Sequence, residues 1–310
     1  MLSTSHISKM PLKDLLCLAC SIKRRITTHM NKLSRDARAQ ILGMMVEGVS
    51  IRAISRMTGA SKNTIVKLLA DAGEAFSDCQ DRTLRGLTCK RVQVDEIWAF
   101  VYAKAKNVET AKAAPEGAGD CWTWMAIDAD TKLIPSFYVG ARDAYAAEAF
   151  IGDLASRLVN RVQLTSDGHK PCLEAVEQSF GADIDYAMLI KIYGDTPGQG
   201  RYSPGVCTGA VQRRVEGRPD PAHVSTSYAE RANLTLRMGS RRFTRLTNAF
   251  SKKVENHAHS VAIHTMHYNF VRIHQTLRCS PAMAAGVTAE LWELSDMVQV
   301  LENWEAPRPA

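Results

Sequence analysis

Three acidic side chains that are distant in the sequence, Asp95, Asp167 and Glu230, are of a type that holds divalent cations when brought together. Three ionised carboxylates within roughly 5 Å of one another repel by a few kcal/mol per pair, even at an effective dielectric of about 20. Two divalent cations reverse that repulsion, and hard oxygen ligands suit Mg²⁺ or Mn²⁺ rather than zinc. In a two-metal site, one ion activates a water or a 3′-hydroxyl and the other stabilises the leaving oxygen of a phosphoryl group.

The first carboxylate lies in the stretch RVQVDEIWAF, where two acidic residues follow each other in an apolar strand pattern. Side chains alternate between the faces of a strand, so Asp95 points with Gln93, whereas Glu96 points with Val94 and Trp98. We therefore expect only one of the pair to serve a given site, and we choose Asp95 because its face is the more polar. The alternative is that the pair forms an ion pair at a strand end.

The second carboxylate, Asp167, lies in QLTSDGH, where a strand ends and glycine begins a turn into a helix. Neighbouring parallel strands would bring it beside Asp95. Taken alone, an Asp before a Gly is commonly a turn former. The prediction for Asp167 therefore depends on its partner.

The third carboxylate, Glu230, begins a helical pattern in STSYAERANLTLRMGSRRF. Ser227 and Glu230 also fit a capping box, in which the glutamate closes the helix N-terminus. Against that reading, Asn233, Arg237 and Arg241 share its polar stripe at steps of three and four residues. We expect this helix to pack on a sheet and to present Glu230 at the strand ends.

The elements that must position these residues read as strands and helices of one sheet. Three strand patterns joined as a meander precede helix, strand, helix and strand patterns, which predicts a mixed sheet covered by helices on both faces. This order resembles the ribonuclease H-like fold, with the first strand at the centre. The patterns are RVQVDEIWAFVY, CWTWMAID and LIPSFYV, then a helix over Ala144–Val159, a strand over Val162–Ser166, a helix from Lys170 and a strand near Met188–Tyr193.

Residues 194–224 are rich in Gly, Pro and Arg, and we expect them to lack regular structure. A loop of this length is functional or disordered, so either a DNA-contacting excursion or a plain insertion would fit. From Ser227 to Arg278 the pattern is again helical and basic.

A small all-α unit precedes the sheet. Ser50–Gly73 contains a Ser-capped helix, a Gly59-Ala60 turn and a second Ser-capped helix, which resembles a helix-turn-helix. The second helix of such a module enters the major groove of DNA. We therefore expect Lys62, Asn63 and Lys67 to face DNA, the alternative being a plain three-helix packing unit.

Charge and cysteine usage narrow the class of protein. The chain has a net charge of +7, with 16 Lys and Arg against 7 Asp and Glu in residues 1–93, and 9 against 2 in Tyr228–Arg278. Two basic regions favour binding of a polyanion at two places, although solvated charged faces are the alternative. Eight scattered cysteines fit a reducing compartment, and the lone Cys17–Cys20 pair lacks a second pair for zinc. We expect no signal peptide and no membrane helix, because the apolar run near Leu15 is short.

Four stretches together resemble the Asp-Asp-Glu transposases of bacterial insertion-sequence-one elements: VQVDEIWAFV, TSDGHK, STSYAERANLTLRMGSRRFTRLTNAFSKKVENH and YNFVRIHQTLRCSPA. The likeness runs from Met30 to about Val287. It implies that Asp95, Asp167 and Glu230 form the metal-binding catalytic triad. It also implies cleavage of strands at element ends and transfer of the freed 3′-hydroxyl into target DNA, by a homo-oligomer in the bacterial cytoplasm that binds double-stranded DNA.

The expected organisation follows from this resemblance. It comprises an appendage (1–29), a helix-turn-helix domain (30–75), a linker (76–90), a ribonuclease H-like catalytic domain (91–287) and a C-terminal tail (288–310). Cationic side chains on and after the Glu230 helix should neutralise phosphates. With the polar stripe, they give as predicted DNA contacts Asn233, Arg237, Arg241, Arg242 and Arg245.

Other interpretations remain open at the level of sequence. His257, His264, His267 and His274 fall at helical spacings, but a metal stripe is the less favoured reading. YNFVRIHQTL resembles a tail motif of insertion-element transposases, which implies that Tyr268, Asn269, Arg272 and His274 brace the Glu230 helix or touch DNA. A sequence-specific DNA-binding regulator with an inert nuclease-like domain would keep the helix-turn-helix without needing metal. A Holliday-junction or RNA-strand nuclease on the same fold would cleave without joining.

Overall fold

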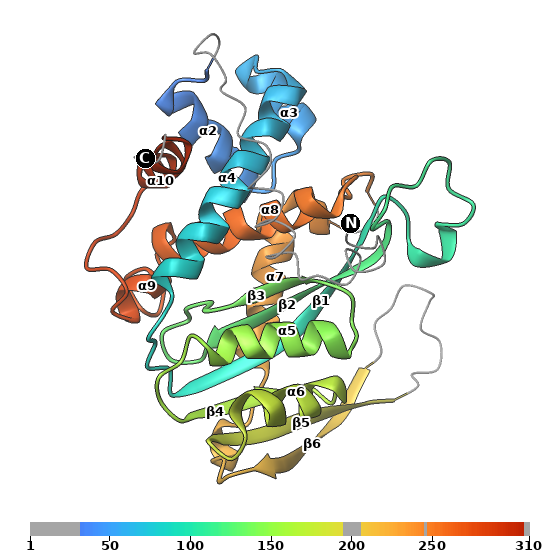
Figure 1. Ribbon diagram of the computed structural model, residues 1–310, viewed down its shortest axis with the longest axis vertical. Coiled ribbons are helices and arrows are strands. Elements are labelled where there is room, and N and C mark those ends of the chain that lie inside the picture. The colour runs from blue at the N-terminus through green and yellow to red at the C-terminus, as the bar shows by residue number, and fades with distance from the viewer. Residues whose placement is uncertain (1–31, 195–205, 245–246, 307–310) are drawn as a thin grey trace, which may run out of the picture.

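The computed structural model describes residues 32–194, 206–244 and 247–306, and its centre is a six-stranded mixed sheet (Figure 1). The strand order is β3-β2-β1-β4-β5-β6, with β1 and β4 in the middle. The β1/β4 and β4/β5 pairs are parallel, and the other pairs are antiparallel. The strands are β1 (Arg91–Val101), β2 (Gly119–Asp128), β3 (Phe137–Gly140), β4 (Val162–Ser166), β5 (Ile184–Gly194) and β6 (Val206–Glu216).

Helices cover both faces of this sheet. The helices α5 (Ala144–Ala155) and α6 (Pro171–Phe180) lie in front of it in Figure 1, and α7 (Ser227–Gly239) lies behind it. Alternation along β1 explains the two layers, because Val92 and Val94 join the core that contains α5, whereas Ile97 and Ala99 join the core that contains α7. The predicted α/β, ribonuclease H-like fold class is confirmed by this arrangement.

The helices before the sheet begin and end with the capping chemistry that the sequence predicts. They are α2 (Arg35–Val46), α3 (Ile51–Thr58) and α4 (Lys62–Thr83). Ser50 and Ser61 cap α3 and α4, and Gly59 ends α3 with a φ of 73° that favours glycine. The helix pair and its short turn thus lie where the sequence places them.

Helix α4 is longer than expected and runs to Thr83, through half of the segment 76–90 that was expected to be a linker. The reason is a long-range partner: α4 packs on α8 (Val254–Met266), and Gln80 donates a side-chain hydrogen bond of 3.2 Å to the Ala262 carbonyl. Ala75, Phe76 and Gln80 continue the buried stripe of the helix beyond residue 73. The polar residues of this stretch give no local indication that α8 packs against it.

The segment expected to be a C-terminal tail is instead part of the helical unit. The helix α10 (Leu294–Glu305) packs on α2 and α4, next to which Figure 1 shows it. The buried guanidinium of Arg38 makes two hydrogen bonds, of 3.0 and 3.2 Å, to the Glu305 carboxylate. The first and last described helices are therefore joined by a bidentate ion pair.

The expectation of an irregular segment over residues 194–224 is wrong for Val206–Glu216, because this stretch forms β6 and pairs antiparallel with β5. All of its side chains are exposed or half-buried, as is usual for an edge strand. Its pairing depends on backbone hydrogen bonds, which leave little trace in residue types.

Within the described part of the chain, none of the helices is long and apolar enough to span a membrane. The predicted appendage over residues 1–29, with Cys17 and Cys20, lies outside the described residues. Arg245, predicted to contact DNA, also lies outside them.

Candidate metal centre

Strand pairing brings the first two predicted carboxylates together. The parallel register places Gln93 of β1 beside Thr165 of β4, so that Asp95 lies level with Asp167, the first residue after the end of β4. One ligand oxygen from each of Asp95, Glu96 and Asp167 lies within 4.8 Å of the others. This acidic cluster (Asp95, Glu96 and Asp167) is the one group of metal-ligating side chains of this size among the described residues.

The presence of Glu96 in the acidic cluster departs from the expectation that only one of the two neighbouring carboxylates can serve the site. Asp95 and Glu96 do point to opposite faces of β1, since Asp95 contacts α7 and Glu96 contacts Arg142 ahead of α5. Strand β4, however, ends at Ser166, one residue before Asp167. Beyond Ser166, β1 has no β4 residue paired beside it. Asp167 is therefore within reach of side chains on both faces of β1.

Arg142 neutralises part of the acidic cluster. Its guanidinium lies 3.0 Å from a Glu96 oxygen and 3.4 Å from an Asp167 oxygen. The Glu96 side chain is only 3% exposed, and burial, followed by the charge of Asp167, raises its pKa to about 8 although Arg142 acts to lower it. Sequence patterns do not identify Arg142 as part of the site, because its contacts with Glu96 and Asp167 come from the tertiary fold.

Asp95 is held from the opposite side by α7. Asn233 donates a side-chain hydrogen bond of 2.9 Å to Asp95, while burial, with the charges of Asp167 and Glu230 acting in the same direction, raises the Asp95 pKa to about 6. The Asn233 side-chain oxygen is buried and has no hydrogen-bond partner among the described residues. Three clustered carboxylates with an orphaned amide oxygen beside them are oxygen donors that suit a hard divalent cation. The residues present therefore fit Mg²⁺ or Mn²⁺.

The third predicted carboxylate, Glu230, lies beside the acidic cluster rather than within it. Its charge contributes to the raised pKa of Asp95, which places it near that residue. Its Oε1 accepts a hydrogen bond of 2.6 Å from the Thr226 hydroxyl and forms an ion pair with Lys191 of β5. The side chain is partly exposed and extends from the first turn of α7.

The capping-box alternative for Glu230 is not what the structure shows. Helix α7 has Thr226 rather than Ser227 as its N-cap, and no side-chain cap bond is made by that residue. Instead, the buried side-chain oxygen of Gln93 accepts hydrogen bonds from the backbone N–H groups of Tyr228 and Ala229, at 2.8 and 3.3 Å. A strand residue two positions before Asp95 thus anchors the helix start and leaves Glu230 free of that task.

The predicted DNA contacts divide into exposed and buried residues. Lys62, Asn63 and Lys67 are exposed on the first turns of α4, where Lys67 also pairs with Asp71. Arg241 is exposed after α7, and Arg237 is half-buried on that helix.

Two further residues predicted to contact DNA make side-chain hydrogen bonds within the protein. Asn233 is 8% exposed and turned to Asp95, because its helix face packs on β1. Arg242 is half-buried and donates a hydrogen bond of 3.0 Å to the Ser251 hydroxyl, while burial lowers its pKa to about 10. Contact of either side chain with DNA stays a prediction.

Among the described residues, the histidines of α8 are not part of any group of three side chains that could hold a metal ion. His257 and His264 are buried, and burial lowers the pKa of each to about 3. Downstream, Asn269 bridges both backbone groups of Ile134 with two hydrogen bonds of 2.9 Å, and so braces the turn between β2 and β3. Asn269 therefore holds that turn, which is a different contact from the predicted one with the Glu230 helix.

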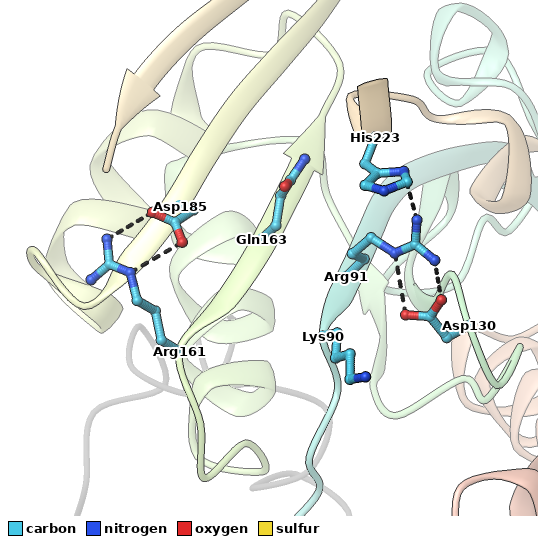
Figure 2. A pocket seen from close by; sticks show the side chains of 7 residues that line it. All are labelled: Lys90, Arg91, Asp130, Arg161, Gln163, Asp185 and His223. Atoms are coloured by element: carbon cyan, nitrogen blue, oxygen red, sulfur yellow. Dashed lines mark hydrogen bonds and ion pairs between the residues drawn. The ribbon is translucent and has the colours of Figure 1, made fainter. Parts of the chain in front are cut away.

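A separate cavity of about 450 Å³ lies at the opposite edge of the parallel strands, where β1 and β4 begin (Figure 2). The two arginines that line it are already paired: Arg91 contacts Asp130 and His223, and Arg161 contacts Asp185 at 2.9 Å. Parallel α/β sheets carry their chemistry at the carboxyl ends of the strands, which is where the acidic cluster lies. We therefore place the functional centre at the acidic cluster.

Comparisons with known proteins give a limited result. No protein-family model and no curated protein match the sequence. Among solved structures, the chain is similar to piggyBac transposase in its synaptic complex with hairpin DNA, at 10% identity and a TM-score of 0.34, over 99% of this chain and 80% of that one. It is also similar to Mos1 transposase in a paired-end complex with the left transposon end, at 12% identity and a TM-score of 0.20, over 54% of this chain and 64% of that one.

Proposed function

We propose that this protein is a metal-dependent DNA transposase that binds the ends of an insertion element, cleaves a strand there and transfers the 3′-hydroxyl to target DNA. The observation that carries the proposal is the acidic cluster at the ends of the parallel strands, with ligand oxygens within 4.8 Å. A ribonuclease H-like sheet that gathers carboxylates at this point, in a basic protein, favours phosphoryl transfer on nucleic acid. The insertion-sequence-one resemblance of the motifs around Asp95, Asp167 and Glu230 supports the finer assignment.

Each residue has a distinct role in this proposal. Asp95 and Asp167 would hold the divalent ions, with Glu96 as a further oxygen donor and Glu230 completing the site from α7. Bound ions would supply the charge that activates the attacking hydroxyl and stabilises the leaving oxygen. Asn233 fixes the Asp95 carboxylate by its hydrogen bond, and Gln93 fixes the start of the helix that carries Glu230.

DNA would be held by two basic regions of the protein. The exposed start of α4, with Lys62 and Asn63, fits the recognition helix of a helix-turn-helix. The exposed Arg241 would hold phosphates near the acidic cluster, and binding should weaken steeply with salt. Because two element ends must be joined, we propose that the protein acts as a homo-oligomer.

The decisive experiment uses a duplex that carries the DNA bordering the coding sequence, mixed with purified protein and Mg²⁺. Cleaved and joined products are expected, and they should disappear in chelator. The variants Asp95→Asn and Asp167→Asn should lose both products while binding the duplex as the wild type does. Unchanged joining by either variant would remove the acidic cluster from the chemistry.

Glu230 needs a test of its own because it lies outside the acidic cluster. Glu230→Gln keeps the hydrogen bond from Thr226 but loses the charge that pairs with Lys191. Loss of cleavage and joining with retained DNA binding is expected. Retained joining would show that another residue, with Glu96 as the first candidate, completes the ligand set.

One observation favours a second function, a DNA-binding regulator with an inert nuclease-like sheet. Arg142 and Lys191 already neutralise Glu96, Asp167 and Glu230, so the carboxylates could form a structural ion-pair network. Nicking of supercoiled plasmid separates the two functions, because the regulator should leave the plasmid intact in Mg²⁺ and in Mn²⁺.

A further inference from the structure

A row of half-buried aromatic side chains leads away from the acidic cluster along one face of the sheet. Glu96, Trp98 and Phe100 are alternate residues of β1 and share that face, and the rings of Trp98 and Phe100 have centroids 5.9 Å apart. Trp98 pairs across the ladder with Trp122 of β2, so these two indoles lie on the same face. All three aromatic residues keep part of their surface open to solvent.

The row continues onto a segment from a distant part of the sequence. The Phe250 ring lies 5.0 Å from that of Phe100. A backbone hydrogen bond of 2.8 Å from Tyr102 to the Ser251 carbonyl fixes the segment beside the end of β1. We call Trp98, Phe100, Trp122 and Phe250 the aromatic strip.

Cations line the aromatic strip over its whole length. The Lys252 ammonium lies 4.4 Å from the centre of the Phe250 ring, and the Lys104 ammonium lies 5.6 Å from that of Trp98. At the other end, the Arg142 guanidinium lies 4.8 Å from the centre of the Trp122 ring. Arg142 also contacts Asp167, so the aromatic strip is continuous with the acidic cluster.

Contact among the rings accounts for part of this arrangement, since aromatic pairs stabilise a fold. It does not account for partly exposed rings with cations beside them, since burial would stabilise more than partial exposure. Proteins that bind single-stranded nucleic acid combine these features, because bases stack on the rings and phosphates pair with the cations. Duplex DNA hides the faces of its bases, so only unpaired bases could use the rings.

We infer that the aromatic strip binds unpaired DNA bases next to the phosphate that reacts at the acidic cluster. The inference rests on the proposed function for the identity of its ligand. A strand whose end is frayed or splayed would place its bases on Trp98 and Phe100 while Lys104 and Lys252 contact its phosphates. The ligand class is therefore single-stranded DNA, without strong preference for a base, because every base has a face that stacks.

The test measures binding without chemistry, in chelator. A fluorescein-labelled oligothymidylate of about 12 nucleotides, within the range of lengths that one small domain covers, is titrated with the full-length protein and followed by anisotropy. An abasic phosphodiester oligomer of the same length and charge is the matched ligand. We expect the abasic oligomer to bind on the order of 10-fold more weakly, the loss that removal of a stacked base produces.

Variants locate the effect on the protein. Trp98→Ala and Phe100→Ala should each weaken oligothymidylate binding on the order of 10-fold and leave binding of the abasic oligomer unchanged. The matched control is Phe180→Ala, which removes a half-buried aromatic ring at the far end of α6 and should change neither affinity. Lys252→Ala should weaken binding of both oligomers, because it removes a cation rather than a stacking surface.

Equal affinity of the wild-type protein for the two oligomers would overturn the inference, and this comparison needs no variant to fold. Unchanged oligothymidylate binding by folded Trp98→Ala would overturn it as well. Failure of the proposed function has a different signature, an intact plasmid in Mg²⁺, which leaves this metal-free binding test unaffected.

Discussion

Asn233 of α7 and Asp95 of β1 are joined by a hydrogen bond of 2.9 Å, and this bond couples the helix that carries Glu230 to the central strand of the sheet. Asn233 is buried and Asp95 is half-buried, and the amide adds to the backbone hydrogen bond that Glu96 gives the same carboxylate. The catalytic geometry proposed above therefore depends on a residue that is itself uncharged.

The first prediction concerns a substitution that removes this hydrogen bond. Asn233→Ala should weaken Mg²⁺ binding by about 10-fold, because the Asp95 carboxylate loses its positioning donor and secondary ligand contacts typically contribute this much. The measurement is the Mg²⁺ dependence of the melting temperature, compared with the exposed control Asn63→Ala. An identical Mg²⁺ dependence in both variants would assign Asn233 to packing alone.

The second prediction concerns the repulsion stored in the acidic cluster. Asp95→Asn should raise the free energy of unfolding in chelator by roughly 1–3 kcal/mol at about pH 8, because the wild-type carboxylate is ionised there despite a raised pKa. The same variant should lose the stabilisation that Mg²⁺ gives the wild type. Urea unfolding with and without Mg²⁺ measures both effects, and a destabilised variant in chelator would contradict the reasoning.

The third prediction is acid sensitivity from α8. Burial lowers the pKa of His257 and His264 to about 3 and that of His259 to about 4, well below the ordinary value of 6.5. Between these values the unfolded chain binds protons that the folded protein does not, so stability falls as the pH falls from about 6.5 towards 3. The urea concentration at the midpoint of unfolding should therefore decrease as the pH is lowered through this range.

A variant separates this effect from general acid unfolding. His264→Asn should flatten the pH dependence, whereas replacement of the exposed His223 by Asn should leave its slope unchanged. Equal slopes for wild type and His264→Asn would show that His264 does not contribute.

The fourth prediction compares two glycines inside helices. An added Cβ at Gly73 of α4 would lie 2.3 Å from the His259 Cβ, so Gly73→Ala should destabilise the protein by about 1–3 kcal/mol through overpacking. At Gly152 of α5 the nearest atom, the Ser179 hydroxyl oxygen, would be 3.8 Å away, and Gly152→Ala should stabilise the protein by roughly 0.5–1 kcal/mol. The free energy of unfolding of the two variants is measured in urea. A change of the same sign in both would contradict the α4–α8 packing.

Much of the fold was predictable because its signals are local. Alternation identified β1, the strand β4 matched its predicted bounds, and serine caps placed the starts of α3 and α4. Elements that depend on distant partners were not predictable in the same way. The second half of α4 is helical because α8 covers it, and the edge strand β6 exists because β5 offers it backbone hydrogen bonds.

The candidate site shows the same division. Asp95 and Asp167 follow from strand order, since parallel neighbours must bring their ends together. Side-chain alternation along β1 assigns Glu96 to the face opposite Asp95 and so predicts only one of them for the site. That prediction assumes a strand on each side of β1, and β4 ends at Ser166. Arg142 and Lys191 reach the carboxylates across the fold, and nothing near them in sequence indicates it.

The bidentate pair between Arg38 and Glu305 has a consequence for protein synthesis. Helix α2 leaves the ribosome well before α10, which supplies part of the surface that α2 packs on. The packing of α2 in a nascent chain is therefore incomplete until the residues up to Glu305 have been made. A polypeptide truncated before Leu294 would lack α10. We expect such truncated products to be degraded by proteases.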